Sequence, residues 1–303
     1  MADVVAALDC GSNSTRLLTQ RRDGTVVHRE TRITRLSEGV DASRRLTDAA
    51  MERSFAVLDE YRAIMDADGV GDGLLVATSA VRDAANGPAF LTEAGRRAGV
   101  DARILTGAEE AAFSYAGATA DLDVVDEPTL VLDVGGGSTE LATGLADGVH
   151  SYSMQLGCVR VTERALGRDA VTPERVAAAR AMIDGELDAA LAAEPALAGL
   201  GEVRLVGLAG TVATLAQLIA GESVYRRELV HHRRIGLDTV VEWRDRLSGE
   251  SPGERLAHPG MVVGREDVLP AGLFVVSAVM TRFGASELLT SESDILDGVA
   301  ASR

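Results

Sequence analysis

The sequence predicts an α/β protein built from two domains of related topology, and three observations support this prediction. The 303 residues are enough for two domains of ordinary size, each with its own hydrophobic core. Apolar runs typical of buried strands alternate with helical patterns along the chain, as in sheets covered by helices. A strand–turn–strand pattern near the N-terminus returns later in the chain, which indicates an internal duplication.

The first strand–turn–strand pattern lies close to the N-terminus. Val4–Leu8 is a continuous apolar run of the kind found in buried strands, and Thr15–Gln20 resumes the strand pattern. Between them lies Asp9, followed by the Gly- and Ser-rich segment 10–14. A turn of this composition between two strands predicts a hairpin with a carboxylate at its mouth.

The second copy of the pattern begins at Thr129. Segment 129–133 predicts a strand, segment 134–138 a Gly-rich turn, and segment 139–142 the return strand. A shift of 124 residues superposes five identical residues within one short register, more than chance supplies. The matched pairs are Asp9 and Asp133, Gly11 and Gly135, Ser14 and Ser138, Thr15 and Thr139, and Leu17 and Leu141.

The segments between the two hairpins alternate between strand and helix. Leu74–Ala77 is strand-like, and Asn86 is placed as the cap of a helix that ends before Gly99. Thr106 and Glu109 have the spacing of a capping box, which opens another helix.

The polar segment 121–128 is the candidate domain boundary. We expect an N-terminal domain over residues 1–124 and a C-terminal domain over residues 125–303. In the second domain Pro173–Ala193 predicts a long helix and Val203–Leu208 a buried strand. Val268–Met280 is shorter than the ~20 residues of a membrane-spanning helix, so we expect a buried helix there.

The composition excludes several classes of function. The formal net charge of −16 disfavours binding to nucleic acid or to anionic membranes. All basic residues are Arg, so a P-loop kinase, which needs a lysine, is excluded. Cys10 and Cys158 lie far apart without metal-ligand spacing, which favours two reduced thiols in the cytoplasm. No secretory signal is visible, and we expect a cytoplasmic protein.

The two Gly- and Ser-rich turns are the candidate phosphate-binding sites. Such turns at strand ends present backbone N–H groups that can converge on phosphate oxygens, and glycine lets the phosphate approach closely. One such turn is usually an ordinary hairpin, but two matched copies, each after an Asp, favour a phosphate cleft. The residues concerned are Gly11, Ser12, Asn13, Ser14, Gly135, Gly136, Gly137 and Ser138.

Carboxylates at these turns are candidate ligands for a divalent cation. Mg²⁺ takes oxygen ligands, usually one or two carboxylates together with phosphates and water. Asp9, Asp133 and Glu140 are placed for this role. The alternative is that each Asp only binds its own turn. The metal role is favoured for Asp133, and for Asp9 the two interpretations remain close.

Several further residues admit both a functional and a purely structural interpretation. Glu109 is accounted for by capping, whereas Glu110 points to another side of its helix and could activate a water. Arg82 follows a predicted strand end, where it could hold a phosphate or form a surface ion pair. The strand-to-helix turn at Gly210 and Thr211 suits an anion but is a weak signal alone.

The segment 226–234 is densely basic in an otherwise acidic chain. Its arginines and histidines would attract a long polyanion, so the segment is a candidate extension of the phosphate-binding site. An ordinary solvated face, balanced by nearby acids, is an equally good interpretation.

Eight collinear segments together resemble the exopolyphosphatase / guanosine pentaphosphate phosphohydrolase family in its short two-domain form. The resemblance spans nearly the whole chain, and the set is specific although no single segment is. The segments are LDCGSNSTRLL, ATSAVRDAAN, ILTGAEEAAFSYAG, LDVGGGSTEL, LGCVRVTERAL, VGLAGTVATL, HPGMVVGREDVLPAG and SESDILDGVA.

The resemblance implies an actin-like ATPase (ASKHA) duplicated fold, with two related domains around a central cleft. It implies Mg²⁺-dependent removal of a terminal phosphate from a phosphoanhydride chain, with Mn²⁺ as a substitute. By position, Glu110 matches the water-activating base, Asp133 and Glu140 the metal-organising acids, and Arg82 a phosphate-binding arginine. It also implies that the last helix, about residues 292–303, packs back on the first domain.

Inorganic polyphosphate is therefore the expected substrate, and guanosine pentaphosphate, converted to the tetraphosphate, is the alternative that shares every motif. A kinase on the same fold and a non-catalytic sensor of alarmones or polyphosphate are further alternatives; the intact acidic set disfavours the sensor. Larger members of the family carry an additional C-terminal module, so we expect low processivity on very long chains. We expect no nucleic-acid or membrane partner, and a homodimer stays open.

Overall fold

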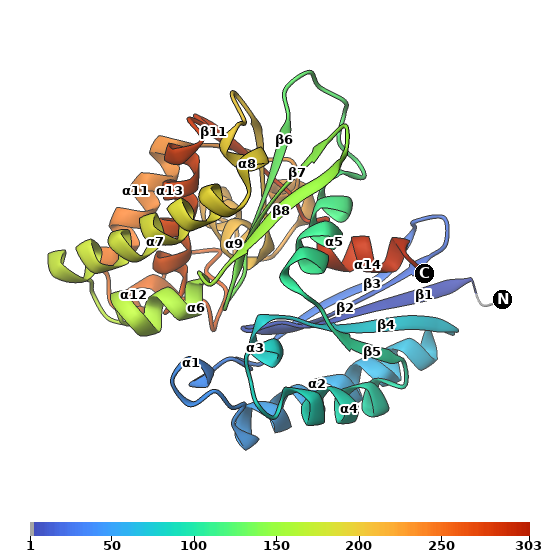
Figure 1. Cartoon of the computed structure of the whole chain (residues 1–303). Coiled ribbons are helices and arrows are strands. Elements are labelled where there is room, and N and C mark those ends of the chain that lie inside the picture. The colour runs from blue at the N-terminus through green and yellow to red at the C-terminus, as the bar shows by residue number, and fades with distance from the viewer. Residues whose placement is uncertain (1–2) are drawn as a thin grey trace. The chain divides into compact units, whose positions relative to one another are not determined.

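The computed structural model describes residues 3–303, which divide into two compact units. The first unit comprises the chain up to Gly117 together with Asp294–Arg303, and the second comprises Ala118–Ser293. The chain thus passes between the units twice, and the first passage lies before the boundary at 124/125 that the sequence suggested. Figure 1 labels the elements along the chain.

The first unit is a five-stranded sheet with helices on both faces. Its strands follow the order β3-β2-β1-β4-β5. They are β1 (Val4–Cys10), β2 (Ser14–Arg21), β3 (Val26–Ile33), β4 (Asp72–Ala77) and β5 (Asp101–Ile104). The helices are α1 (Val40–Ser43), α2 (Asp48–Ala67), α3 (Ser79–Arg82), α4 (Gly87–Ala98), α5 (Gly107–Thr119) and α14 (Ile295–Ala301).

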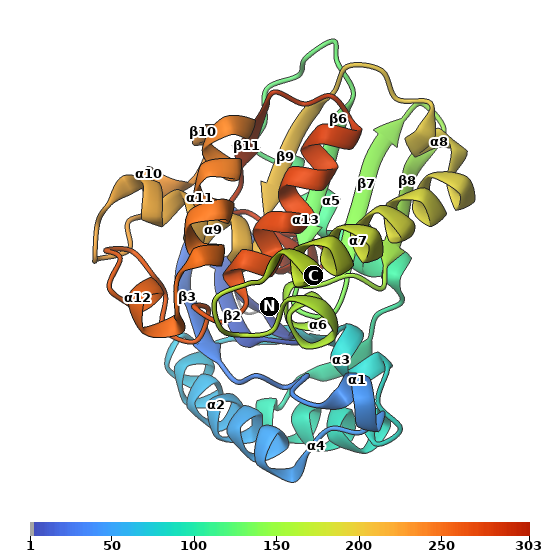
Figure 2. The ribbon, with the colours of Figure 1, turned by 90° about the vertical axis from the view of Figure 1, so that its left-hand side faces the viewer.

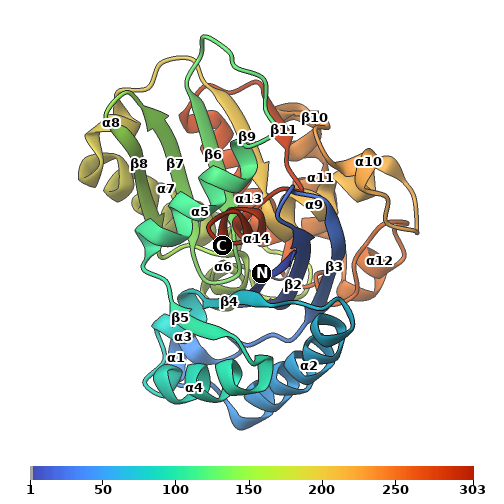
Figure 3. The same ribbon diagram turned by 90° about the vertical axis from the view of Figure 1, so that its right-hand side faces the viewer.

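The alternation of side chains along β1 explains the two faces of this sheet. Ala6, Leu8 and Cys10 point into the core formed with α2 and α4, which lie side by side in Figures 1 and 3. Val5 and Ala7 point to the opposite face, where they pack with α14. Asp9 continues the second series, so its carboxylate lies on the α14 face of the sheet.

The second unit repeats this topology. Its sheet has the order β10-β11-β9-β6-β7-β8, and the part β8-β7-β6-β9-β11 corresponds to β3-β2-β1-β4-β5 of the first unit. Its strands are β6 (Thr129–Val134), β7 (Thr139–Leu145), β8 (Gly148–Met154), β9 (Arg204–Leu208), β10 (Arg234–Gly236) and β11 (Glu287–Thr290).

The helices of the second unit enclose one large core, and Figure 2 shows α7, α11 and α13 along its sheet. They are α6 (Cys158–Val161), η1 (Thr162–Leu166), α7 (Pro173–Ala193), α8 (Pro195–Ala198), α9 (Ala209–Ala220), α10 (Arg227–Val230), α11 (Leu237–Gly249), α12 (Pro252–Leu256) and α13 (Leu269–Arg282). The buried helix expected over Val268–Met280 is α13. No helix among residues 3–303 is long and apolar enough to span a membrane.

The pairing of the hairpins confirms the duplication seen in the sequence. In the first hairpin Asp9 lies opposite Arg16, and in the second Asp133 lies opposite Glu140. Because the pairs are related by the same shift of 124 residues, both hairpins have the same register, and their turns close with equivalent hydrogen bonds. The two units therefore have related folds, as an actin-like duplicated protein requires.

Two local predictions about helix ends have different outcomes. The capping box is confirmed, because Thr106 N–H donates to Glu109 and Glu109 N–H donates to the Thr106 hydroxyl. Asn86 does occupy the N-cap of α4, but its side chain makes no capping bond. Its amide instead exchanges two hydrogen bonds with the backbone of Leu46, which ties the preceding loop to the helix.

Candidate active site

The first unit gathers its predicted site residues at the carboxyl edge of its sheet. Strands β1 and β4 are parallel and end together, with Cys10 beside Ala77. The turn after β1 therefore lies next to the start of α3, and the hydroxyls of Ser12 and Ser79 are hydrogen bonded at 3.0 Å. The next strand, β5, ends at the same edge and leads into α5, which carries Glu110.

The turn of the first hairpin is held through its carbonyl groups. The carbonyl of Ser12 accepts the N–H of Ser37, and the carbonyl of Asn13 accepts the N–H groups of Thr34 and Arg35. In a trans peptide the following N–H points the opposite way, so the N–H groups of Asn13 and Ser14 face away from segment 34–37.

Two buried polar atoms of this hairpin have no hydrogen-bond partner among the described residues. They are Oδ1 of Asp9 and the side-chain nitrogen Nδ2 of Asn13. Both side chains are more than nine-tenths buried. Buried polar groups are normally paired, so an acceptor and a donor left unpaired in one turn indicate a place for a polar ligand.

Arg16 occupies the position opposite Asp9. Its Nε and Nη2 atoms donate to Oδ2 of Asp9 at 2.9 and 2.7 Å. Burial raises the pKa of Asp9, while the guanidinium of Arg16 acts in the opposite direction. A cation at Asp9 would have to share this carboxylate with Arg16, which makes Asp9 the weaker of the predicted metal ligands.

Glu110 lies in the first turn of α5 and is 6% exposed. Its Oε2 atom accepts a hydrogen bond from Nη1 of Arg82 at 3.0 Å, and the same nitrogen donates to the carbonyl of Leu105 at 2.9 Å. The neighbouring Glu109 is turned outward into the capping box. The structure thus separates adjacent glutamates into a helix cap and a buried carboxylate, as their positions on the helix predicted.

The second hairpin presents a turn with three aligned amide groups. The carbonyls of Gly135 and Gly136 accept N–H groups from the start of α6, and the carbonyl of Gly137 accepts Nε of Arg160 at 2.9 Å. The N–H groups of residues 136–138 therefore point away from α6, because peptide C=O and N–H are antiparallel. Three successive N–H groups on one side form an anion-binding concavity.

Asp133 and Glu140 form an acidic pair beside this turn. They lie directly opposite each other on β6 and β7, so both side chains are on the same face of the sheet. Both are buried, and Ser153 donates to Oε1 of Glu140 at 2.6 Å. Two buried oxygen donors on facing strands suit a hard divalent cation such as Mg²⁺.

The turn at Gly210 is shaped by an arginine that the sequence analysis did not single out. A Cβ atom at Gly210 would overlap the guanidinium of Arg265, so any larger residue here would displace this side chain from the turn. Ala209, one residue earlier, has φ +67°, a left-handed conformation that is strained for alanine. Thr211 is buried against Gly272 of α13, whereas Ala209 and Gly210 are partly exposed.

Other supporting residues were also missed by sequence reasoning. Arg16, Ser79, Ser153, Gly157 and Arg160 contact predicted site residues, or their loops, in the unit to which they belong. Arg16, Ser79, Gly157 and Arg160 lie inside motifs quoted above, but a linear pattern does not reveal which carboxylate or carbonyl each one contacts.

The basic segment 226–234 is balanced in part by nearby acids, in the direction of the second interpretation. Arg226 pairs with Glu222 and lies near Glu228, and Arg234 pairs with Glu287. Arg227 and Arg233 instead donate to neutral groups, the hydroxyl of Ser293 and the carbonyl of Leu229, so ion pairing reduces the positive charge of the segment without removing it.

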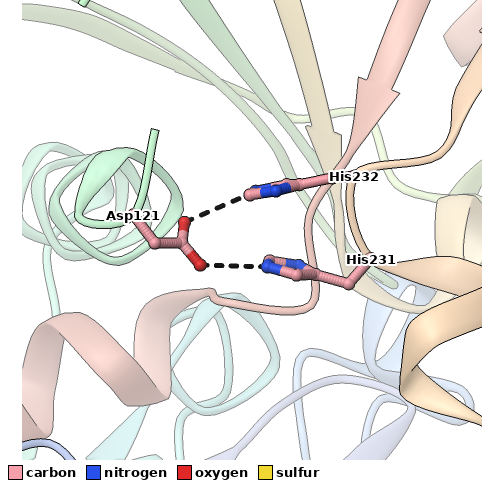
Figure 4. Close-up of side chains that lie close together, drawn as sticks. All are labelled: Asp121, His231 and His232. Atoms are coloured by element: carbon pink, nitrogen blue, oxygen red, sulfur yellow. Dashed lines mark hydrogen bonds and ion pairs between the residues drawn. The ribbon is translucent and has the colours of Figure 1, made fainter. Parts of the chain in front are cut away.

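A further cluster in the second unit joins Asp121, His231 and His232, with stacked imidazole rings (Figure 4). The Nδ1 atom of His231 accepts the backbone N–H of Glu292 at 3.0 Å, so the neutral ring carries its proton on Nε2, which lies 2.9 Å from Asp121. A metal-bound histidine would need that nitrogen deprotonated and the other donating. The cluster is therefore built as a hydrogen-bonded clamp.

Two cavities of about 300 and 260 Å³ lie elsewhere on the units. The larger is lined by the amino-terminal ends of β9 and β11, and the smaller by the start of β4. The larger includes Arg234 of the basic segment, and neither includes a predicted residue of the turns, the metal site or the catalytic site. They lie at the edges of the sheets that parallel α/β proteins do not use for ligand binding.

Comparisons with known proteins agree with the geometry. The chain is 39% identical to "Exopolyphosphatase 2" of Mycobacterium tuberculosis over 315 aligned positions, which cover 98% of each chain. Its fold matches the crystal structure of an exopolyphosphatase-like protein with a TM-score of 0.91 at 33% identity, over 98% of this chain and 97% of the other. It matches the Ppx/GppA family member from Aquifex aeolicus with a TM-score of 0.81 at 28% identity, over 100% and 97% of the two chains.

The family model gives the same result over nearly the whole sequence. The model of the Ppx/GppA phosphatase family matches residues 18–303, which extend over both units and include every predicted site residue except Asp9 and residues 11–14. Together with the full-length relative and the duplicated fold, this match shows that the chain belongs to the Ppx/GppA phosphatase family.

Proposed function

We propose that this protein is an exopolyphosphatase, which hydrolyses the terminal phosphoanhydride of inorganic polyphosphate and releases orthophosphate. The observation that carries the proposal is the second hairpin, where a buried Asp133–Glu140 pair stands beside three aligned amide groups. Cation ligands next to an anion-binding turn are the elements that phosphoryl transfer needs. The relative from Mycobacterium tuberculosis is named for the same activity.

In this proposal the turns of residues 11–14 and 135–138 bind phosphate oxygens through their amide groups, and the turn at residues 210–211 contributes further contacts. Amide groups suit this chain, because it has no lysine and its net charge is −16. Arg82 contributes a guanidinium. Its hydrogen bonds to other side chains and carbonyls of residues 3–303 are made through Nη1, which leaves Nε and Nη2 for a phosphate.

Asp133 and Glu140 are the proposed ligands of Mg²⁺, for which Mn²⁺ can substitute, and Asp9 is a third candidate. A bound divalent cation would neutralise charge on the phosphate oxygens during the reaction. Ser153 holds one oxygen of Glu140, which orients the remaining oxygen.

Glu110 is the proposed general base. It accepts a proton from the attacking water, whose oxygen forms a bond to the terminal phosphorus while the bridging P–O bond breaks. The leaving phosphate of the shortened chain carries the negative charge of the broken anhydride. Arg82 keeps the carboxylate in place through the hydrogen bond to Oε2.

Guanosine pentaphosphate is the second candidate substrate, because the motifs quoted above are shared by both activities of the family that they resemble. Phosphate release by the purified protein should be compared for polyphosphates of several lengths and for guanosine pentaphosphate. We expect the higher kcat/KM with polyphosphate. No release from any polyphosphate, with release from the nucleotide, would reassign the substrate.

The metal role is tested in the same assay. Activity should disappear in excess EDTA and return with Mg²⁺ or Mn²⁺, and Asp133→Asn should raise the Mg²⁺ concentration for half activation by about tenfold or more. Asp123→Asn, in the polar segment before the second hairpin, is the control and should leave it unchanged. Full activity in excess chelator would contradict the proposal.

A further inference from the structure

A network of five charged residues connects the first hairpin with the start of α14 in the first unit. The guanidinium of Arg16 bridges Asp9 and Asp294, donating to Asp294 through Nη1. Arg29 lies on the other side of Asp294, at 3.7 Å, and donates to Asp297 at 2.5 Å. Asp294 and Asp297 belong to the segment SESDILDGVA, which the proposed function has not yet used.

The contact between Arg16 and Asp9 has an unusual geometry. In a bidentate pair two guanidinium N–H groups bind the two oxygens of a carboxylate. Here Nε and Nη2 of Arg16 both bind Oδ2 of Asp9, and Oδ1 has no hydrogen-bond partner although it is buried. The third donor group of Arg16, Nη1, is engaged by Asp294.

Asp294 is itself held firmly by α14. It is the N-cap of this helix and accepts the N–H of Leu296 at 2.9 Å, while its own N–H donates to Asp297 at 2.7 Å. The helix packs on β1 and β2, the strands that carry Asp9 and Arg16. Asp294 can therefore fix the orientation of Arg16.

The unpaired atoms beside this network have complementary chemistry. Oδ1 of Asp9 accepts hydrogen bonds, and Nδ2 of Asn13 donates them. A phosphate oxygen suits the amide, and a water of a hydrated cation, or the cation itself, suits the carboxylate. A hydrated Mg²⁺–phosphate group satisfies both.

We propose that Asp294 is a positioning residue: it holds Arg16 so that the guanidinium binds only Oδ2 of Asp9 and leaves Oδ1 for a hydrated Mg²⁺–phosphate group. The proposal rests on the phosphatase function proposed above. Without the contact to Asp294, the guanidinium of Arg16 could turn towards Asp9 and bind both of its oxygens, which would remove the acceptor from the ligand.

The test compares Asp294→Asn with Asp297→Asn, which removes a carboxylate from the same network without touching Arg16. Asparagine caps a helix as well as aspartate does, so both variants are expected to fold. Binding of the non-hydrolysable imidodiphosphate with Mg²⁺ is measured by calorimetry, and kcat and KM are measured with tripolyphosphate. We expect about tenfold or greater weakening of binding and loss of kcat in Asp294→Asn, and less than about twofold in Asp297→Asn.

Introducing the same change into a variant that lacks Arg16 shows whether Asp294 acts through Arg16. In an Arg16→Gln protein the Asp294→Asn change should cause no further loss of binding, because the group it orients is gone. An undiminished loss in that background, or equal losses in the Asp294 and Asp297 variants, overturns the proposal.

If circular dichroism shows that Asp294→Asn does not fold, binding to Arg16→Lys is measured instead. The single ammonium group of lysine cannot bind both carboxylates as the guanidinium does, so binding should weaken. Binding as strong as in the wild-type protein would then overturn the proposal. Should the wild-type protein bind imidodiphosphate but release no phosphate from polyphosphate, the proposed function fails and the binding comparison still tests Asp294.

Discussion

Asp9 and Asp133 occupy equivalent positions in the two hairpins, but their neighbours give them different chemistry. The residue opposite Asp133 is Glu140, and the residue opposite Asp9 is Arg16. Two carboxylates attract a divalent cation, whereas a carboxylate bound to a guanidinium is already partly neutralised. The difference at this one position, Arg16 against Glu140, is the reason for proposing the stronger metal site in the second unit.

The adjacent residues Glu109 and Glu110 in α5 also differ in their surroundings. Glu109 is exposed and caps its helix, and its hydrogen bonds to Thr106 keep the pKa of Glu109 below its usual value. Glu110 is buried and paired with Arg82. Burial protects the carboxylate of Glu110 from bulk water, and Arg82 holds it in place, as a general base requires.

We predict that Glu110→Gln lowers kcat by about 100- to 10,000-fold and largely preserves substrate binding. The amide has nearly the same shape but cannot accept the proton from water. Glu109→Gln is the matched control and should reduce stability by at most about 1 kcal/mol, with kcat nearly unchanged. Both are measured by phosphate release and urea unfolding, and equal losses of kcat would remove Glu110 from this role.

At the scale of elements, the Gly-rich turn after β6 depends on close packing with the start of α6. A Cβ atom at Gly157 would overlap the carbonyl of Gly136, although the backbone of Gly157 has a conformation that any residue can adopt. Glycine is required there by space alone. The contact keeps the carbonyls of the turn on the α6 side and so keeps its N–H groups together on the other side.

We predict that Gly157→Ala disturbs this turn and raises KM for polyphosphate by about tenfold or more, because the three aligned amide groups lose their common direction. The control is Gly185→Ala in α7, where a Cβ atom would meet no neighbouring atom within 4 Å. That change should raise stability by about 0.5–1 kcal/mol and leave KM unchanged. A Gly157→Ala protein with the wild-type KM would show that the turn does not depend on this contact.

At the scale of the whole molecule, the cluster of Asp121, His231 and His232 joins the two segments in which the chain passes between the units. Asp121 comes shortly after the first passage, and Glu292 comes shortly before the second. The ring of His231 is hydrogen bonded to the carboxylate of Asp121 and to the backbone of Glu292. Burial lowers the pKa of His231, and the nearby Arg227 and His232 act in the same direction. Protonation of Nδ1 would place two donors face to face and break the bond to Glu292.

The clamp should therefore make stability depend on pH. Because the pKa of His231 in the folded protein is below the value of about 6.5 in the unfolded chain, its contribution is present above that pH and is lost as the pH falls below it. His150 should have the opposite effect on stability, because its hydrogen bond to Asp147 raises the pKa of His150. The contribution of His150 to stability is therefore present at low pH and is lost as the pH rises.

We predict that lowering the pH from 8 to about 5.5 changes the stability of the wild-type protein in opposite directions relative to two variants. The wild-type protein should become less stable relative to His231→Gln and more stable relative to His150→Gln. Glutamine does not titrate in this range, and its Nε2 can still donate to Asp121. The measurement is the urea midpoint at several pH values. Differences of the same sign for both variants would contradict the assigned roles.

Local features of the sequence were sufficient for several of the strands and helices and for the duplicated hairpins. The limits of α7 and the capping box before α5 follow from residues a few positions apart, because helix capping and hydrophobic periodicity act over one or two turns. The shift that relates Asp9 to Asp133 was visible in the same way, since side-chain alternation along each strand determines which residues share a face.

The partners of the charged residues were decided only by the tertiary structure. Arg16 and Asp294 are 278 residues apart, Arg82 and Glu110 are 28 apart, and Gly210 admits an arginine from a distant loop. Sequence patterns name such residues as candidates, but a charge interacts with whichever group packing brings within a few ångströms. That is why the sequence identified the candidate site residues, and why their partners became known only once the sheets and helices of each unit were packed together.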